Sequence, residues 1–140
     1  MQVISEAGIV LGSRAETPEG AILECGQLLI ELGSVTPEYL AAMFEREQIM
    51  SSAIGEGLAI PHGTASAREF VNFDQLVLLQ LAKPIPWGDQ IVELVIGIAS
   101  KANTHVGLLS KIAQMATDGG LGKIREAENK NEILSLLKSL

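Results

Sequence analysis

The sequence has a single cysteine, few aromatic residues and no long hydrophobic run, and each shortage excludes a class of protein. One cysteine cannot form an internal disulfide, so a reducing compartment is the expected setting. One tryptophan, one tyrosine and three phenylalanines offer little surface on which nucleic-acid bases could stack. The longest apolar runs, residues 76–82 and 94–99, are far shorter than the roughly 20 residues that cross a bilayer as a helix.

Positive charge is also scarce, because 10 lysines and arginines face 17 acidic residues and give a net charge of −7. The basic residues form no cluster, which argues against nucleic acid or an anionic membrane as the main partner. Residues 1–6 contain no basic region, so we expect no signal peptide. The sequence therefore predicts a cytoplasmic protein with no nucleic-acid partner and no membrane insertion.

The 140 residues, 47% of them hydrophobic, suit one folded domain over residues 1–140. Thr17-Pro18 and Thr36-Pro37 are typical helix starts, with threonine as the cap and proline at the first helical position. Helices before and after a group of apolar strands predict an α/β layered fold. The expected helices are 17–32, 36–48, 105–117, 121–127 and 131–138, and the expected strands are 8–12 at an edge, 58–60, 76–81 and 91–98, with a turn at 82–89.

The segment Gly57-Leu58-Ala59-Ile60-Pro61-His62-Gly63-Thr64 places a histidine where a short apolar strand ends. Pro61 favours an extended conformation for the residue before it and cannot donate to a sheet ladder, so it suits the point where the strand leaves the sheet. Gly63 lets the backbone turn or another group come close. The pattern predicts an imidazole, that of His62, at the rim of a sheet.

His105, the second of two histidines, is expected in the first turn of the helix that follows strand 91–98. Ligands of open α/β sheets gather beyond the carboxyl ends of strands, so both histidines are candidates for one crevice. A neutral imidazole is a nucleophile that can accept a phosphoryl group, and guanidinium groups stabilise the transferring charge. Arg46 and Arg68 are the arginines closest in sequence to His62.

Other chemistry has less support. His62, His105 and Glu56 could form a metal site, but the sequence has neither an HExxH motif nor a Cys/His cluster. A serine hydrolase would require a G-x-S-x-G motif, which is missing. Cys25 lies among apolar residues in the middle of a predicted helix, so we interpret it as a buried structural thiol. No metal and no cofactor is therefore expected.

The segment 57–64 resembles the active-site signature of the mannitol/fructose-type enzyme IIA of the bacterial sugar phosphotransferase system. Residues 39–47 resemble the Y-x-x-x-M-x-x-R-E segment of that family, and residues 94–99 followed by His105 resemble its last core strand and second-histidine helix. The early segments 9–12 and 21–22 are similar to the mannitol branch. The resemblance covers nearly the whole chain.

The resemblance implies a phosphotransferase component with a mixed, mostly parallel sheet flanked by helices on both faces. His62 matches the histidine that accepts a phosphoryl group from phospho-HPr and passes it to the cysteine of a IIB partner. Arg46 matches the arginine beside that group, His105 the second active-site histidine, and Glu56 an acidic position of the mannitol branch. One departure is Thr104, which stands where the family commonly has glutamate.

The family resemblance leaves two functions open. One is a phosphocarrier in sugar-alcohol uptake, with mannitol favoured by the flanking segments. The other is a regulatory module of the same fold, whose phosphorylation state controls a partner protein. In either case the protein must dock other proteins, and we expect an apolar collar around His62 to which Leu58, Ile60 and nearby exposed apolar residues contribute.

Overall fold

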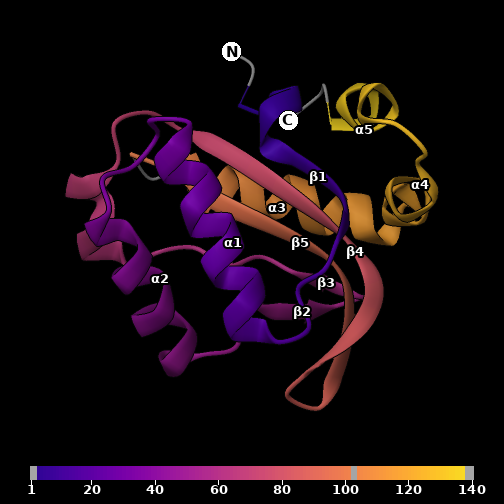
Figure 1. Cartoon of the computed structure of the whole chain (residues 1–140), viewed down its shortest axis with the longest axis horizontal. Coiled ribbons are helices and arrows are strands. Elements are labelled where there is room, and N and C mark those ends of the chain that lie inside the picture. The colour runs from indigo at the N-terminus through magenta and orange to yellow at the C-terminus, as the bar shows by residue number, and fades with distance from the viewer. Residues whose placement is uncertain (1–2, 102–103, 138–140) are drawn as a thin grey trace.

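The chain forms one mixed β-sheet with helices on both sides (Figure 1). The structure is a computed structural model that describes residues 3–101 and 104–137, and the side chains at 104–106, 108 and 117 also lie outside the described residues. The strands are β1 (Ile9–Ser13), β2 (Ala53–Gly55), β3 (Leu58–Ala59), β4 (Gln75–Trp87) and β5 (Gln90–Ala99). The helices are η1 (Glu6–Gly8), α1 (Pro18–Glu31), α2 (Glu38–Ile49), η2 (Ala65–Phe70), α3 (Thr104–Thr117), α4 (Gly120–Glu126) and α5 (Lys130–Leu137).

The five strands lie in the order β1-β4-β5-β3-β2. The central strands β4 and β5 pair antiparallel, β1 pairs parallel to β4, β3 pairs parallel to β5, and β2 closes the other edge antiparallel to β3. The predictions of two buried central strands and of an edge strand near residue 10 are confirmed. The order matters for the site, because the short strand β3 lies directly beside β5.

Successive side chains of the central strands point to opposite faces of the sheet, so each face has its own core. The helices α1 and α2 cover one face, and α3, α4 and α5 cover the other (Figure 1). The predicted α/β class, with helices on both faces of a mixed sheet, is confirmed. The first core includes Ile22, Met43, Val77, Leu79 and Val95, and the second includes Leu76, Leu78, Ile96, Ile112, Ile124 and Ile133. No helix among residues 3–101 and 104–137 is long and apolar enough to cross a membrane.

The two threonine–proline pairs behave differently. At α1 the Thr17 hydroxyl accepts a hydrogen bond from the Gly20 N–H at 3.0 Å, and Pro18 is the first helical residue, as predicted. At α2 the helix begins at Glu38, one residue later than expected, because Pro37 takes the cap position. Proline has no side-chain acceptor, so the start of α2 lacks a side-chain cap. The expected cap at Thr36 is therefore wrong.

The predicted turn at residues 82–89 is also wrong, since β4 continues to Trp87 and only the two residues before Gln90 turn. The last β1 residue to pair with β4 is Ser13, opposite Leu81, and β4 is an edge strand beyond that point. A proline that lacks an N–H is tolerated where one side of a strand has no neighbour. This is why Pro84 and Pro86 lie within a strand although their composition suggests a turn.

Cys25 joins α1 to the centre of the sheet. Its side chain is fully buried, and burial raises the pKa of the thiol, which therefore stays protonated and poorly nucleophilic. The prediction of a buried structural thiol is confirmed. The facing residue is Gly97 of β5, where an added Cβ would lie 2.9 Å from both Cys25 Cβ and Val77 Cγ2. Glycine at position 97 thus sets how closely α1 approaches the sheet.

We predict that Gly97→Ala lowers the free energy of unfolding by about 1–3 kcal/mol, because the added methyl group overpacks the contact with Cys25. Gly107→Ala is the matched control, since no heavy atom lies within 4 Å of a Cβ added there in α3. That substitution should raise the free energy of unfolding by about 0.5–1 kcal/mol, the usual gain in a helix interior. Urea unfolding followed by circular dichroism measures both changes. A Gly97→Ala protein as stable as wild type would contradict the close packing of α1 on β5.

Candidate functional site

His62 lies just beyond β3, at the point where the chain leaves the sheet. Its backbone still bridges to Ile98 of β5 in parallel register, and the Ile98 N–H donates to the Pro61 carbonyl at 3.0 Å. The side chain is half-buried. The sequence prediction of a histidine at a strand end is confirmed, and β5 holds the backbone on which this histidine stands.

The imidazole of His62 is oriented by the chain that precedes it. Nδ1 lies 2.8 Å from the Ile60 carbonyl oxygen, two residues earlier. A carbonyl oxygen can only accept a hydrogen bond, so Nδ1 carries the proton in this contact. In the neutral ring the lone pair is then on Nε2. The local backbone thus selects the tautomer in which Nε2 carries the free lone pair.

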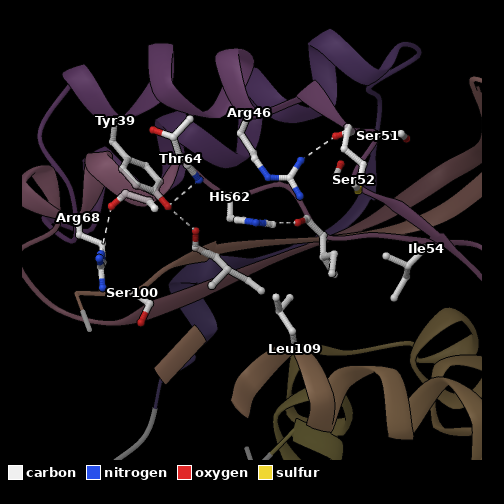
Figure 2. Close-up of a pocket in the computed structure, with 15 residues that line it drawn as sticks. Tyr39, Arg46, Ser51, Ser52, Ile54, His62, Thr64, Arg68, Ser100 and Leu109 are labelled. Carbon is white, nitrogen blue, oxygen red and sulfur yellow. Dashed lines mark hydrogen bonds between the residues drawn. The ribbon is translucent and has the colours of Figure 1, made fainter. Parts of the chain in front are cut away.

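Tyr39 fixes the segment after the histidine. Its hydroxyl accepts from the Gly63 N–H at 2.8 Å and donates to the Ile98 carbonyl at 2.9 Å (Figure 2). The residue is only 4% exposed, and burial raises the pKa of its hydroxyl, so it stays protonated and able to donate. A Cβ at Gly63 would lie 2.6 Å from the tyrosine ring, so only glycine fits there. Tyr39 therefore ties α2 and β5 to the backbone next to His62.

A cavity of about 430 Å³ opens in front of these groups (Figure 2). Its wall includes His62 and Tyr39, the two arginines Arg46 and Arg68, and Leu109 from α3. No carboxylate side chain lines this cavity among the described residues. The chain as a whole has a net charge of −7, so the cavity is a locally positive site on an acidic protein.

Both arginines are oriented by backbone carbonyl groups. Arg46 lies in the last turn of α2, and its Nη1 donates to the Met50 carbonyl at 2.8 Å. Arg68 lies in η2, and its Nε donates to the Ala65 carbonyl at 3.1 Å. A guanidinium group has five N–H donors, so each arginine can hold its backbone contact and still bind an anion. The structure thus brings Arg46 and Arg68, the two arginines that the sequence places closest to His62, to the same cavity as that histidine.

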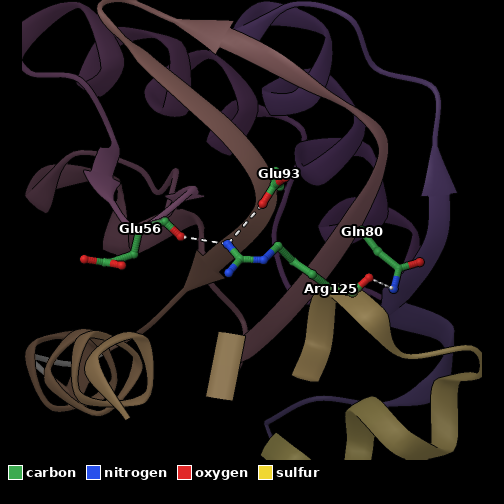
Figure 3. A network of polar contacts seen from close by, with 4 residues as sticks. All are labelled: Glu56, Gln80, Glu93 and Arg125. Atoms are coloured by element: carbon green, nitrogen blue, oxygen red, sulfur yellow. Dashed lines mark hydrogen bonds and ion pairs between the residues drawn. The ribbon is translucent and has the colours of Figure 1, made fainter. Parts of the chain in front are cut away.

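The other two predicted site residues are placed differently. His105 is in the first turn of α3, one turn before the cavity-lining Leu109, but its side chain lies outside the described residues. Glu56 does not line the cavity. It occupies the turn between β2 and β3 with a φ of 57°, and its carbonyl accepts from Arg125 Nη1 at 3.0 Å. Arg125 also pairs with Glu93 at 3.1 Å, and the Glu56 carboxylate points away from this contact (Figure 3).

The apolar surface near His62 differs from the prediction. Leu58 and Ile60 are 0% and 7% exposed, because both side chains belong to the core between the sheet and α3, so the expected collar from these two residues is wrong. The exposed apolar residues are Ile49 at 71%, Met50 at 64% and Ile54 at 43%. Met50 and Ile54 line the cavity itself. Met50, directly after α2, and Ile54, in β2, are thus the nearby exposed apolar residues that the collar prediction also included.

The arrangement suits attack by an imidazole on an electrophile that carries negative charge. The Ile60 carbonyl sets the tautomer of His62, Tyr39 holds the neighbouring peptide, and the two arginines offer donors to anionic oxygens. Among the described residues, no group of three His, Cys, Asp or Glu side chains could hold a metal ion. The sequence missed the role of Tyr39, although the tyrosine stands in a segment that carries the family resemblance.

Known proteins resemble this chain in both sequence and fold. The family model of the phosphoenolpyruvate-dependent sugar phosphotransferase system, EIIA 2, matches residues 2–140. A mannitol-specific phosphotransferase enzyme IIA component from Staphylococcus aureus (strain MRSA252) is 38% identical over 133 residues, which cover 94% of this chain and 92% of that protein.

Two solved structures have the same fold. Enzyme IIAMTL from Escherichia coli, in a complex with phosphorylated enzyme IIBMTL, superposes with a TM-score of 0.90 at 31% identity over 97% of both chains. The crystal structure of IIA mannitol from Escherichia coli gives a TM-score of 0.87 at 33% identity, over 95% of this chain and 97% of that one. The chain therefore belongs to the EIIA 2 family of the phosphoenolpyruvate-dependent sugar phosphotransferase system and is a phosphotransferase component.

Proposed function

We propose that the protein is a phosphocarrier in which His62 accepts a phosphoryl group from phospho-HPr and passes it to the cysteine of a IIB partner. The observation that carries this proposal is the hydrogen bond from His62 Nδ1 to the Ile60 carbonyl, in a cavity lined by Arg46 and Arg68. Imidazole with its lone pair on Nε2 is the nucleophile, and the arginines match the charge of a phosphoryl group.

In the first step Nε2 of His62 attacks the phosphorus of the donor phosphohistidine. A nitrogen–phosphorus bond forms at Nε2, the bond to the donor imidazole breaks, and its electron pair stays on the donor nitrogen. The proton on His62 Nδ1 is shared with the Ile60 carbonyl throughout, which stabilises the positive charge that develops on the ring. The transition state is loose and metaphosphate-like, so positioning and positive charge supply most of the catalysis.

In the second step a cysteine thiolate of IIB attacks the same phosphorus, and the nitrogen–phosphorus bond of His62 breaks. The enzyme IIAMTL of similar fold was solved in a complex with phosphorylated IIBMTL, which supports a IIB partner for this chain. The curated relative is mannitol-specific, and mannitol is accordingly the sugar alcohol that we propose. We assign His105 a supporting role without covalent modification, whereas the role of Glu56 stays a prediction from the family resemblance.

We predict that His62→Ala abolishes phosphorylation. Incubation with phosphoenolpyruvate, enzyme I and HPr should add one acid-labile phosphoryl group to the wild-type protein and none to the variant, as measured by intact-mass spectrometry. His105→Ala is the control, and it should still take up the group because His105 is not the acceptor. Labelling that persists in His62→Ala would refute the assignment.

We predict that Arg46→Gln lowers the rate of phosphorylation by about tenfold to a hundredfold, the usual loss for one or two hydrogen bonds to a charged group. The thermal midpoint should change little, because Arg46 is bonded to an exposed backbone carbonyl. Arg14→Gln removes an exposed arginine that does not line the cavity and is the control for net charge. Equal rates for Arg46→Gln and Arg14→Gln in rapid-quench assays would show that only net charge matters.

A further inference from the structure

Ser52 carries a hydroxyl group for which the fold provides no partner. The residue is 4% exposed, its Oγ is buried, and within the described part of the chain this oxygen makes no hydrogen bond. Ser52 also lines the cavity that contains His62 and Arg46 (Figure 2). A buried hydroxyl without a partner destabilises a folded protein, so such a group is rare and calls for an explanation.

Hydrogen bonds hold both the N–H and the carbonyl of Ser52, so the position of its Cα and Cβ is fixed. The Ser52 N–H donates to the carboxylate of Glu47, at 3.2 and 3.1 Å, and the Ser52 carbonyl accepts from the Ile60 N–H at 2.9 Å. Glu47 is in turn held by Trp87, whose Nε1 donates to it at 3.0 Å.

These contacts place Ser52 between the two functional elements. Glu47 follows Arg46 directly on α2, and the Arg46 guanidinium donates to the carbonyl of Met50, two residues before Ser52. Ile60, on the other side, is the residue whose carbonyl orients the His62 ring. Ser52 is thus tied to the helix that carries the arginine and to the segment that carries the histidine.

We propose that the Ser52 hydroxyl donates a hydrogen bond to an oxygen of the phosphoryl group on His62. This inference rests on the proposed function, since it requires that His62 be phosphorylated. A phosphoryl oxygen is a strong acceptor, and rotation of one side-chain torsion is enough to redirect a serine hydroxyl. The hydroxyl is already out of water, so the serine loses no hydration when the new bond forms. The Ser52 hydroxyl therefore serves the phosphorylated state, whereas in the unphosphorylated fold only the Ser52 backbone makes hydrogen bonds.

The test compares Ser52→Ala with the wild-type protein in the unphosphorylated and in the phosphorylated state. In the unphosphorylated protein the substitution removes an unpartnered polar group, so the thermal midpoint should stay equal or rise. In the phosphorylated protein it removes one hydrogen bond to a charged group, so the equilibrium constant for phosphoryl exchange with phospho-HPr should fall about tenfold. This constant follows from the ratio of the phosphorylated protein to phospho-HPr at equilibrium. ³¹P NMR measures that ratio after the protein is mixed with a known amount of phospho-HPr.

Two further variants control the result. Ser52→Thr keeps a hydroxyl at the same position and should restore the exchange equilibrium. Thr36→Val removes the other buried hydroxyl that has no hydrogen-bond partner among the described residues, but it does not line the cavity, so this variant should exchange like wild type.

The possible failures are distinguishable. A wild-type exchange constant in Ser52→Ala would overturn the role of the hydroxyl while leaving His62 as the acceptor. An equal loss in Thr36→Val and Ser52→Ala would also overturn it, because the effect would then be a general loosening. Acid-stable phosphoserine at position 52 would overturn it as well. A wild-type protein that accepts no phosphoryl group would instead refute the proposed function.

Discussion

The hydrogen bond between His62 Nδ1 and the Ile60 carbonyl is the contact on which the site depends. It exists because Pro61 keeps the chain extended between the two residues, and because β5 fixes that extended segment through the Pro61 carbonyl. Tyr39 secures the next peptide through the Gly63 N–H. The central strand β5 and a buried tyrosine thus hold the segment that sets which nitrogen of the His62 imidazole carries the proton.

The charge of the site opposes the charge of the molecule. Arg46 and Arg68 face the cavity, while the chain has seven more acidic than basic residues, 17 against 10. Two positive side chains thus line a cavity without a described carboxylate, on a chain whose net charge is −7, and such a local concentration of one charge attracts groups of the opposite sign. The exposed apolar residues Met50 and Ile54 at the same opening are suited to contact a protein partner.

Local signals in the sequence were sufficient for most of the elements and for the position of His62 at a strand end. The apolar runs in β4 and β5, the Thr17 cap and the Pro61-His62-Gly63 strand end all follow from short-range chemistry, and the structure confirms them. The continuation of β4 through Pro84 was missed, because tolerance for proline depends on where the neighbouring strand stops. The residue at which β1 stops pairing with β4 is set by the tertiary structure, and no local sequence pattern indicates it.

The groups that support His62 were harder to predict for the same reason. Tyr39 and Gly63 are 24 residues apart, and the Tyr39 hydroxyl bonds to a carbonyl that is 59 residues away. Nothing near Ser52 in the sequence indicates that it lines a cavity. Leu58 and Ile60 are core residues because α3 covers them. Residue type and spacing thus predicted where His62 lies, whereas long-range pairing decides which groups surround it.

We infer that the Ile60 carbonyl makes Nε2 of His62 the phosphoryl acceptor. The most direct test is a two-dimensional ¹H–¹⁵N spectrum of the imidazole region, recorded on ¹⁵N-labelled protein before and after phosphorylation. We predict a protonated Nδ1 in both states and a phosphorus–nitrogen coupling at Nε2 in the phosphorylated one. A coupling at Nδ1 of His62, or a free protein with its proton on Nε2, would contradict the account.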